Sequence, residues 1–93
     1  MQKGETKQYA IYREKTDELL NHIKNTKSGI MYAWCRSPVI AFKYLSHSDA
    51  MEAAQKIADN KNYCLAVCEL HKSDRKIGLA NPTTVLPRPE SSF

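Results

Sequence analysis

The chain has 93 residues and a formal net charge of +4, with 42% hydrophobic and 26% charged residues. This length is enough for one domain with a single core, and the composition is ordinary for a soluble globular protein. No apolar run approaches the ~20 residues of a membrane span, and the polar start of the chain does not resemble a secretory signal peptide.

The first two predicted elements are a strand and a helix. Residues 7–13 (KQYAIYR) are rich in aromatic and β-branched side chains and favour a strand, although they could also form the first turns of a helix. Thr16 is suited to cap a helix over residues 16–28, with acidic residues in its first turn and a narrow apolar stripe. Gly29 then fits the left-handed position that follows a helix.

The centre of the chain predicts a hairpin followed by a second helix. Two apolar runs, residues 30–35 and 39–45, are joined by a short connection that contains Pro38. Ser48 is the expected N-cap of the helix that follows, which ends near Lys61. Small and apolar residues recur there at the spacing of one helix face, namely Ala50, Ala53, Ala54, Ile57 and Ala58.

The last third predicts two more strands and a tail. Residues 62–70 (NYCLAVCEL) have the length and composition of a strand, and residues 77–80 are expected to add a short one. Three prolines follow, which is typical of an extended segment. We therefore expect a single domain over residues 1–81 and a C-terminal tail over residues 82–93.

This order of elements predicts an α+β fold. It corresponds to the ferredoxin-like βαββαβ two-layer sandwich, in which one antiparallel sheet carries two helices on one face. If residues 7–13 are helical instead, a long helix packed on a three-stranded meander is the alternative. One face of the last strand is expected in the core, together with Leu20, Ile23, Ile40, Phe42, Ala50, Ala53 and Ile57.

Two predicted strands are apolar on both faces. Residues 30–35 and 62–70 do not alternate between apolar and polar side chains, whereas a sheet with one face in water should show such alternation. We therefore expect the face away from the helices to be covered by the C-terminal tail, by a second subunit or by a ligand.

The sequence contains no recognisable catalytic or metal-binding motif. Cys64, Cys68 and His71 have a spacing that invites a zinc site. On a strand, however, Cys64 and Cys68 would lie roughly 13 Å apart, too far to share an ion or form a disulfide. The glycines stand far apart, so no phosphate-binding loop is present. We expect a non-catalytic protein without cofactor or metal, its three cysteines free in the cytoplasm.

Part of the centre resembles a known family. Residues 40–57 are similar to the third strand and second helix of RNA recognition motif domains, on the basis of Asp49-Ala50 and Ala53-Ala54 after an aromatic-rich strand. The resemblance covers about a fifth of the chain and implies the βαββαβ fold and RNA binding by aromatic rings on the sheet. Val39 and Ala41 depart from that pattern, because they stand where the base-stacking rings would be.

Charge and composition leave two functional hypotheses. Residues 1–45 contain eight basic and four acidic residues, whereas residues 46–93 contain six of each, so the positive excess lies in the first half. The favoured hypothesis is a small protein-interaction module, acting as adaptor, inhibitor or oligomeric scaffold, that binds another protein or itself as a homo-oligomer. Accessory proteins of phages and mobile elements often have this size and composition. The alternative is a module that binds nucleic acid or a phosphate ligand. Both hypotheses rely on the same candidate residues: Tyr32, Trp34, Arg36, Lys43, Lys24 and Lys27.

Overall fold

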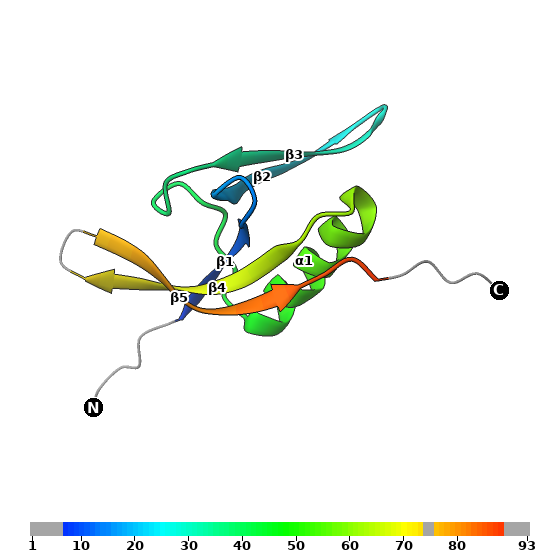
Figure 1. Cartoon of the computed structure of the whole chain (residues 1–93). Coiled ribbons are helices and arrows are strands. Elements are labelled where there is room, and N and C mark those ends of the chain that lie inside the picture. The colour runs from blue at the N-terminus through cyan, green and yellow to red at the C-terminus, as the bar shows by residue number, and fades with distance from the viewer. Residues whose placement is uncertain (1–6, 74–75, 89–93) are drawn as a thin grey trace.

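A computed structural model describes residues 7–73 and 76–88. These residues form one five-stranded antiparallel sheet with a single helix against one of its faces (Figure 1). The strand order across the sheet is β3-β2-β1-β4-β5. The elements in chain order are β1 (Gln8–Arg13), β2 (Glu18–Thr26), β3 (Gly29–Cys35), α1 (His47–Lys61), β4 (Leu65–Ser73) and β5 (Lys76–Val85). The prediction of a ferredoxin-like βαββαβ sandwich with two helices is therefore wrong, and so is the element order that the resemblance to RNA recognition motifs implies.

β1 is the central strand of the sheet. It pairs with β2 along one edge and with β4 along the other, which confirms the strand predicted near residues 7–13 and rules out the helical alternative. Ala10 and Ile11 are both fully buried. Because neighbouring residues of a strand point to opposite faces, each of them lies in a different cluster of buried side chains. The sheet therefore has buried side chains on both faces of its middle strand.

β2 occupies the residues that were expected to form the first helix, so that expectation is wrong. Leu19 and Leu20 fit a narrow helical stripe, yet they are buried on opposite sides of the sheet. A strand between two partners can bury both side chains, whereas a helix lying on a surface would bury one stripe. Asp17, with φ of 57°, lies in the turn before β2. Gly29, with φ of 131°, is the first residue of β3, directly after the β2–β3 turn, and does not end a helix.

Residues 36–46 join β3 to α1 without forming a strand; they are called the connecting segment below. The second hairpin strand predicted over residues 39–45 is therefore wrong. β2 pairs with β1 only at the Arg13 end, and the connecting segment enters the opening between them. There Tyr44 exchanges two backbone hydrogen bonds of 2.8 Å with Tyr9 of β1.

Two residues of the connecting segment were expected in the core and are not there. Ile40 is 59% exposed and Phe42 is 38% exposed. The backbone N–H of Phe42 donates to the carbonyl oxygen of Leu20 at 2.8 Å, and the Asn21 side chain donates to the carbonyl of Ile40 at 2.6 Å. The segment is thus held at a few backbone positions, and the side chains of Ile40 and Phe42 remain exposed.

α1 confirms the helix predicted from the spacing of small residues. Its N-cap is Ser46 rather than the expected Ser48, because the Ser46 hydroxyl accepts a hydrogen bond from the Asp49 N–H at 3.3 Å. Asn62, with φ of 60°, ends the helix in the left-handed conformation. Small residues of α1 let the helix approach the sheet closely, so that its inner face is fully buried (Ala50, Ala54, Ile57 and Ala58).

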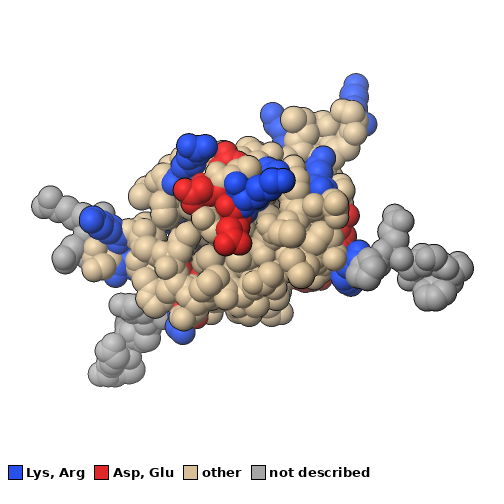
Figure 2. All heavy atoms as spheres, viewed as in Figure 1, with Lys and Arg blue, Asp and Glu red and all other residues tan. Residues whose placement is uncertain are grey.

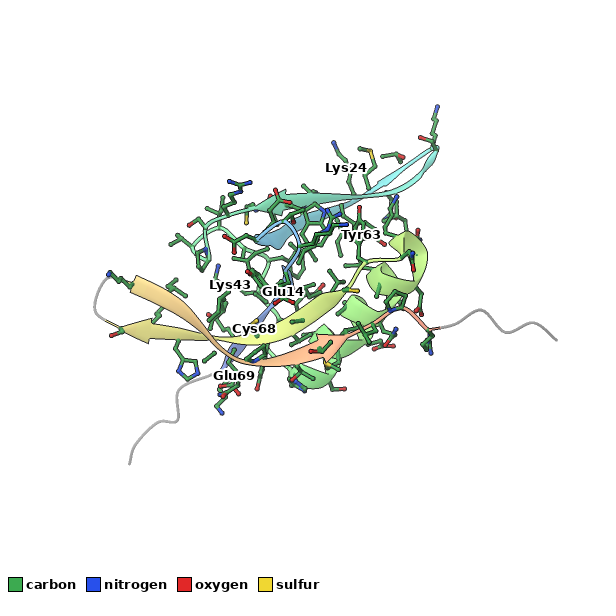
Figure 3. The ribbon with its side chains drawn as sticks, viewed as in Figure 1. Glu14, Lys24, Lys43, Tyr63, Cys68 and Glu69 are labelled. Carbon is green, nitrogen blue, oxygen red and sulfur yellow. The ribbon has the colours of Figure 1, made fainter. Side chains whose placement is uncertain are left out.

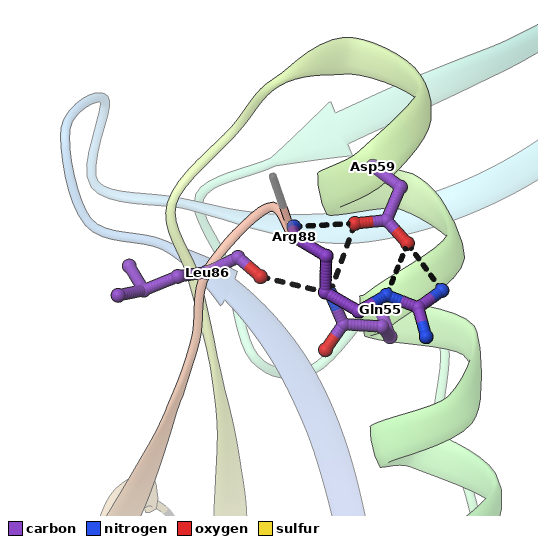
Figure 4. Close-up of polar contacts among 4 residues, drawn as sticks. All are labelled: Gln55, Asp59, Leu86 and Arg88. Atoms are coloured by element: carbon purple, nitrogen blue, oxygen red, sulfur yellow. Dashed lines mark hydrogen bonds and ion pairs between the residues drawn. The ribbon is translucent and has the colours of Figure 1, made fainter. Parts of the chain in front are cut away.

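β4 and β5 form a hairpin on the side of the sheet opposite the β2–β3 hairpin. The strands predicted over residues 62–70 and 77–80 are confirmed in kind, and β5 is longer than expected, since it includes residues 82–85 of the expected tail. Beyond β5, the Leu86 carbonyl accepts a hydrogen bond of 2.8 Å from Gln55 of α1 (Figure 4). The Arg88 guanidinium contacts the Asp59 carboxylate at 2.6 Å. The chain up to Arg88 therefore lies against α1; residues 89–93 are outside the described part.

The sheet face opposite α1 is partly covered by the connecting segment. Ala41 packs there with Ala10 and Leu19, and the three side chains are nearly or fully buried. The sequence predicted that the C-terminal tail, a second subunit or a ligand would cover this face, and the connecting segment is none of these. Coverage by a second subunit or a ligand remains a prediction.

Candidate interaction site

An open apolar groove lies between α1, the β2–β3 hairpin and the connecting segment. Its volume is about 620 Å³. Side chains from all three parts line it: Ile23, Ile30, Tyr32, Phe42, Lys43, Tyr44, Leu45, Asp49, Glu52, Ala53, Lys56 and Ile57. This apolar groove combines elements that are distant in sequence, and it is the candidate interaction site.

The groove is apolar because its walls expose large side chains that nothing in the described chain covers. Ile30 of β3 is 41% exposed, and Leu45 of the connecting segment is 67% exposed. Phe42 lies beside them, its ring centroid 4.8 Å from that of Tyr44. A cluster of exposed apolar side chains marks an interaction site, because each Å² removed from water contributes about 25 cal/mol.

The charged groups of the groove are mixed in sign. The Lys43 ammonium donates hydrogen bonds to the carbonyl oxygens of Val39 and Ala41, at 2.8 and 3.0 Å, and so fastens the connecting segment (Figure 3). α1 adds two carboxylates and one ammonium group to the rim. Burial, with a smaller contribution from Tyr32, raises the pKa of Tyr44 above its ordinary value of 10.0, so that hydroxyl stays neutral. The charges of the groove therefore do not share one sign, and its exposed walls are mainly apolar.

The free edge of the sheet continues directly from the groove. β3 pairs only with β2 among the described strands, and Figure 1 shows it at the outer border of the sheet. None of its seven residues (GIMYAWC) is charged. Ile30 and Tyr32 belong both to this edge strand and to the groove wall. Unpaired backbone groups beside apolar side chains are what an added strand requires.

The structure brings two of the six candidate residues to the groove. Tyr32 lines it from β3, and Lys43 lines it from the connecting segment. Trp34 lies elsewhere, with its ring 6.0 Å from that of Tyr63 and 5.6 Å from the Arg13 guanidinium. These contacts therefore do not bring Tyr32 and Trp34 together as a surface on which bases could stack.

The other three candidate residues are dispersed. Lys24 lies on the outer part of β2, Lys27 is in the β2–β3 turn, and Arg36 is exposed at the start of the connecting segment (Figure 3). Figure 2 shows cations at the outer end of the β2–β3 hairpin, whereas basic and acidic side chains are interspersed over the middle of the face in view. None of these three cations lines the apolar groove with Tyr32.

Sequence reasoning missed the apolar walls of the groove. Phe42 was expected in the core, and Ile30 and Leu45 were expected only to form strands. An apolar run predicts burial against some surface, but the run itself does not show whether the same chain provides that surface. The available signal was the lack of alternation in residues 30–35 and 39–45.

The described residues contain no group of three or more His, Cys, Asp or Glu side chains able to hold a metal ion. The three cysteines are free thiols. Cys68 lies in a hollow of about 300 Å³ on the face opposite α1, and burial raises the pKa of its thiol above the ordinary value of 9.0. Such a thiol is a poor nucleophile at neutral pH.

Within the described residues, no helix is both long and apolar enough to cross a membrane. No known protein family, no curated protein and no solved structure matches this chain.

Proposed function

We propose that this protein is a small protein-interaction module that pairs through the edge of β3 and closes its apolar groove in doing so. The observation that supports this proposal is the continuity of an uncharged, unpaired edge strand with a groove lined by exposed apolar side chains. Strand addition supplies backbone hydrogen bonds, and alternate side chains of the added strand would lie beside Ile30 and Tyr32.

The occupant that we propose is β3 of a second copy. Antiparallel pairing of β3 with itself is symmetric, so one surface serves both subunits and the assembly closes as a dimer. Because β3 has no charged residue, the pairing brings no like charges together. The resulting sheet would run through both subunits, which fits the expectation of a homo-oligomer. Free thiols fit a reducing compartment such as the cytoplasm.

Light scattering of Met31→Lys tests this proposal. Met31 is 58% exposed near the middle of β3, so the lysine should leave the fold intact while placing two charges close to the dimer axis. We expect the unmodified protein to be a dimer and Met31→Lys to be a monomer with an unchanged circular dichroism spectrum.

Leu79→Lys is the matched control, because Leu79 is an exposed apolar residue on β5, the opposite edge strand. That variant should remain a dimer. Monomeric unmodified protein at high micromolar concentration would contradict the proposal, and so would equal dissociation of the two variants.

A further inference from the structure

A second, chemically different cleft lies where β1 ends and α1 ends. Arg13 is the last residue of β1, Lys15 is in the β1–β2 turn, and Lys61 is the last residue of α1. These three cations line a cleft of about 260 Å³ with Asn62, Tyr63 and Cys64. Among residues 7–73 and 76–88, no acidic side chain lines it. The cleft is called the basic cleft below.

Arg13 is held in place by aromatic rings rather than by a carboxylate. Its guanidinium carbon lies 3.7 Å from the centroid of the Tyr63 ring and 5.6 Å from that of Trp34. The two rings meet edge to face. Stacking on a ring fixes the guanidinium plane while leaving the N–H groups at its rim available. In residues 7–73 and 76–88, no side-chain hydrogen bond or ion pair uses Arg13.

The other two cations are also available for a ligand. Neither Lys15 nor Lys61 makes an ion pair within the described residues. Lys61 stabilises the carboxyl end of α1, where the helix dipole favours a cation, but this explains one of the three charges only. Glu18 is the nearest acid by strand register, since it pairs with Arg13 across β1 and β2, yet it forms no ion pair with it.

We propose that the basic cleft binds a phosphate group. The fork of N–H donors on Arg13 matches two phosphate oxygens, and the two ammonium groups balance the remaining negative charge. Three cations exceed what a carboxylate would neutralise, whereas they suit a phosphate dianion or adjoining phosphodiesters. The ligand is therefore a free or nucleotide phosphate or the backbone of a single-stranded nucleic acid. The proposal is independent of dimerisation through β3.

Fluorescence titration can follow binding directly, because Trp34 is the only tryptophan and contacts Arg13. We would titrate the full chain with inorganic phosphate, with ATP and with a short single-stranded oligothymidylate, each at two salt concentrations. We expect a saturable signal that weakens with salt. A log–log slope of about −0.7 per phosphate contact is expected for the oligonucleotide. Saturation by phosphate and ATP identifies a small-anion site, and saturation by the oligonucleotide alone identifies a backbone site.

Two double variants separate the cleft from general positive charge. Lys15→Gln with Lys61→Gln should weaken binding about tenfold or more, which corresponds to about 1.4 kcal/mol or more, because it removes two ammonium groups that would contact the phosphate. Lys24→Gln with Lys27→Gln removes the same charge from the β2–β3 hairpin and should change affinity less than about twofold. Arg13→Lys retains the charge but removes the fork, and should also weaken binding.

Glu18→Gln should strengthen binding, because it removes the acid that lies opposite Arg13. The proposal is overturned if none of the three probes saturates, or if the two double variants lose affinity equally. Circular dichroism of every variant confirms that it is folded before its affinity is compared.

Discussion

The two halves of the sheet are packed to very different degrees. α1 covers β1, β4 and β5, where Ile11, Ile57 and Val67 are fully buried. The β2–β3 hairpin extends past the helix, and Ile30 and Phe42 remain exposed there. A helix with its side chains is about 10 Å across and strands are about 4.8 Å apart, so one helix covers two to three strands. A five-stranded sheet with one helix must therefore leave part of its inner face open.

This difference explains why the candidate interaction site lies beside the β2–β3 hairpin. A ferredoxin-like fold would have a second helix over the remaining strands, but residues 18–26 form β2 instead. Compared with a ferredoxin-like sheet, this sheet therefore has one more strand and only one covering helix instead of two. The connecting segment fills part of the gap through Tyr44 and leaves the apolar groove beside it. Substitutions in the packed half and in the open half can test this difference in packing.

The largest effect is expected from the same substitution made in each half. Ile11→Ala removes a fully buried side chain from β1 and should lower the free energy of unfolding by about 2–5 kcal/mol. Ile30→Ala removes a half-exposed side chain and should cost about 1 kcal/mol or less. Denaturant unfolding of both variants, at a concentration where each is in the same oligomeric state, measures the difference. Equal costs would show that the β2–β3 hairpin is packed as firmly as β1.

A smaller effect is expected at the start of the helix that creates the packed half. Ser46→Ala removes the N-cap hydroxyl and should cost about 1 kcal/mol. Ser48→Ala changes an exposed residue inside the helix and should be neutral within about 0.5 kcal/mol. Denaturant unfolding distinguishes them, and the reverse order would place the cap at Ser48.

Acid should lower the stability of the packed half near β5. The Arg88 backbone N–H and then its guanidinium hold the pKa of Asp59 below the ordinary value of 3.8, and His71 and then Asn81 hold that of Glu69 below 4.5. A lowered pKa in the folded state contributes stability that is present above the unfolded-state value. That contribution disappears as pH falls through the folded-state pKa, which for each of these carboxyl groups lies below its ordinary value.

Asp59→Asn should therefore flatten the fall in melting temperature below about pH 4 and leave the profile above about pH 6 unchanged in shape. Glu52→Gln, on an exposed position of the same helix, is the control and should retain the acid dependence. An unchanged acid profile for Asp59→Asn would mean that the Arg88 contact does not stabilise β5.

The smallest effect concerns thiol reactivity. Cys64 is exposed, whereas Cys68 is buried and its pKa is raised by that burial. Iodoacetamide at neutral pH should therefore modify Cys64 well before Cys68, as measured by mass spectrometry of the peptides. Rapid modification of Cys68 in the folded protein would show that the face opposite α1 opens in solution.

The candidate site could be predicted in part. Tyr32 and Lys43 were expected and do line the groove, because an apolar strand beside a cation is visible in the sequence. The basic cleft could not be predicted, since Arg13 and Lys61 stand far apart in the chain and meet only when β1 and α1 end at the same place. The proximity of these two cations depends on the topology of the fold rather than on any local sequence pattern.

The sequence by itself determined the elements whose pattern has one solution. The small and apolar residues of α1 recur at helical spacing from Ala50 to Ala58, and β4 lies in an apolar run of strand length. Residues 7–13 favoured a strand but also fitted the start of a helix. The tertiary structure decided the rest. Leu19 and Leu20 fit a helical stripe as well as a strand, and the strand forms because β1 and β3 supply partners for its backbone and burial for both side chains. Residues 39–45 have the composition of a strand but remain irregular. Their backbone bonds to β1 only at Tyr44 and to the backbone of β2 only at Phe42, so no continuous ladder forms.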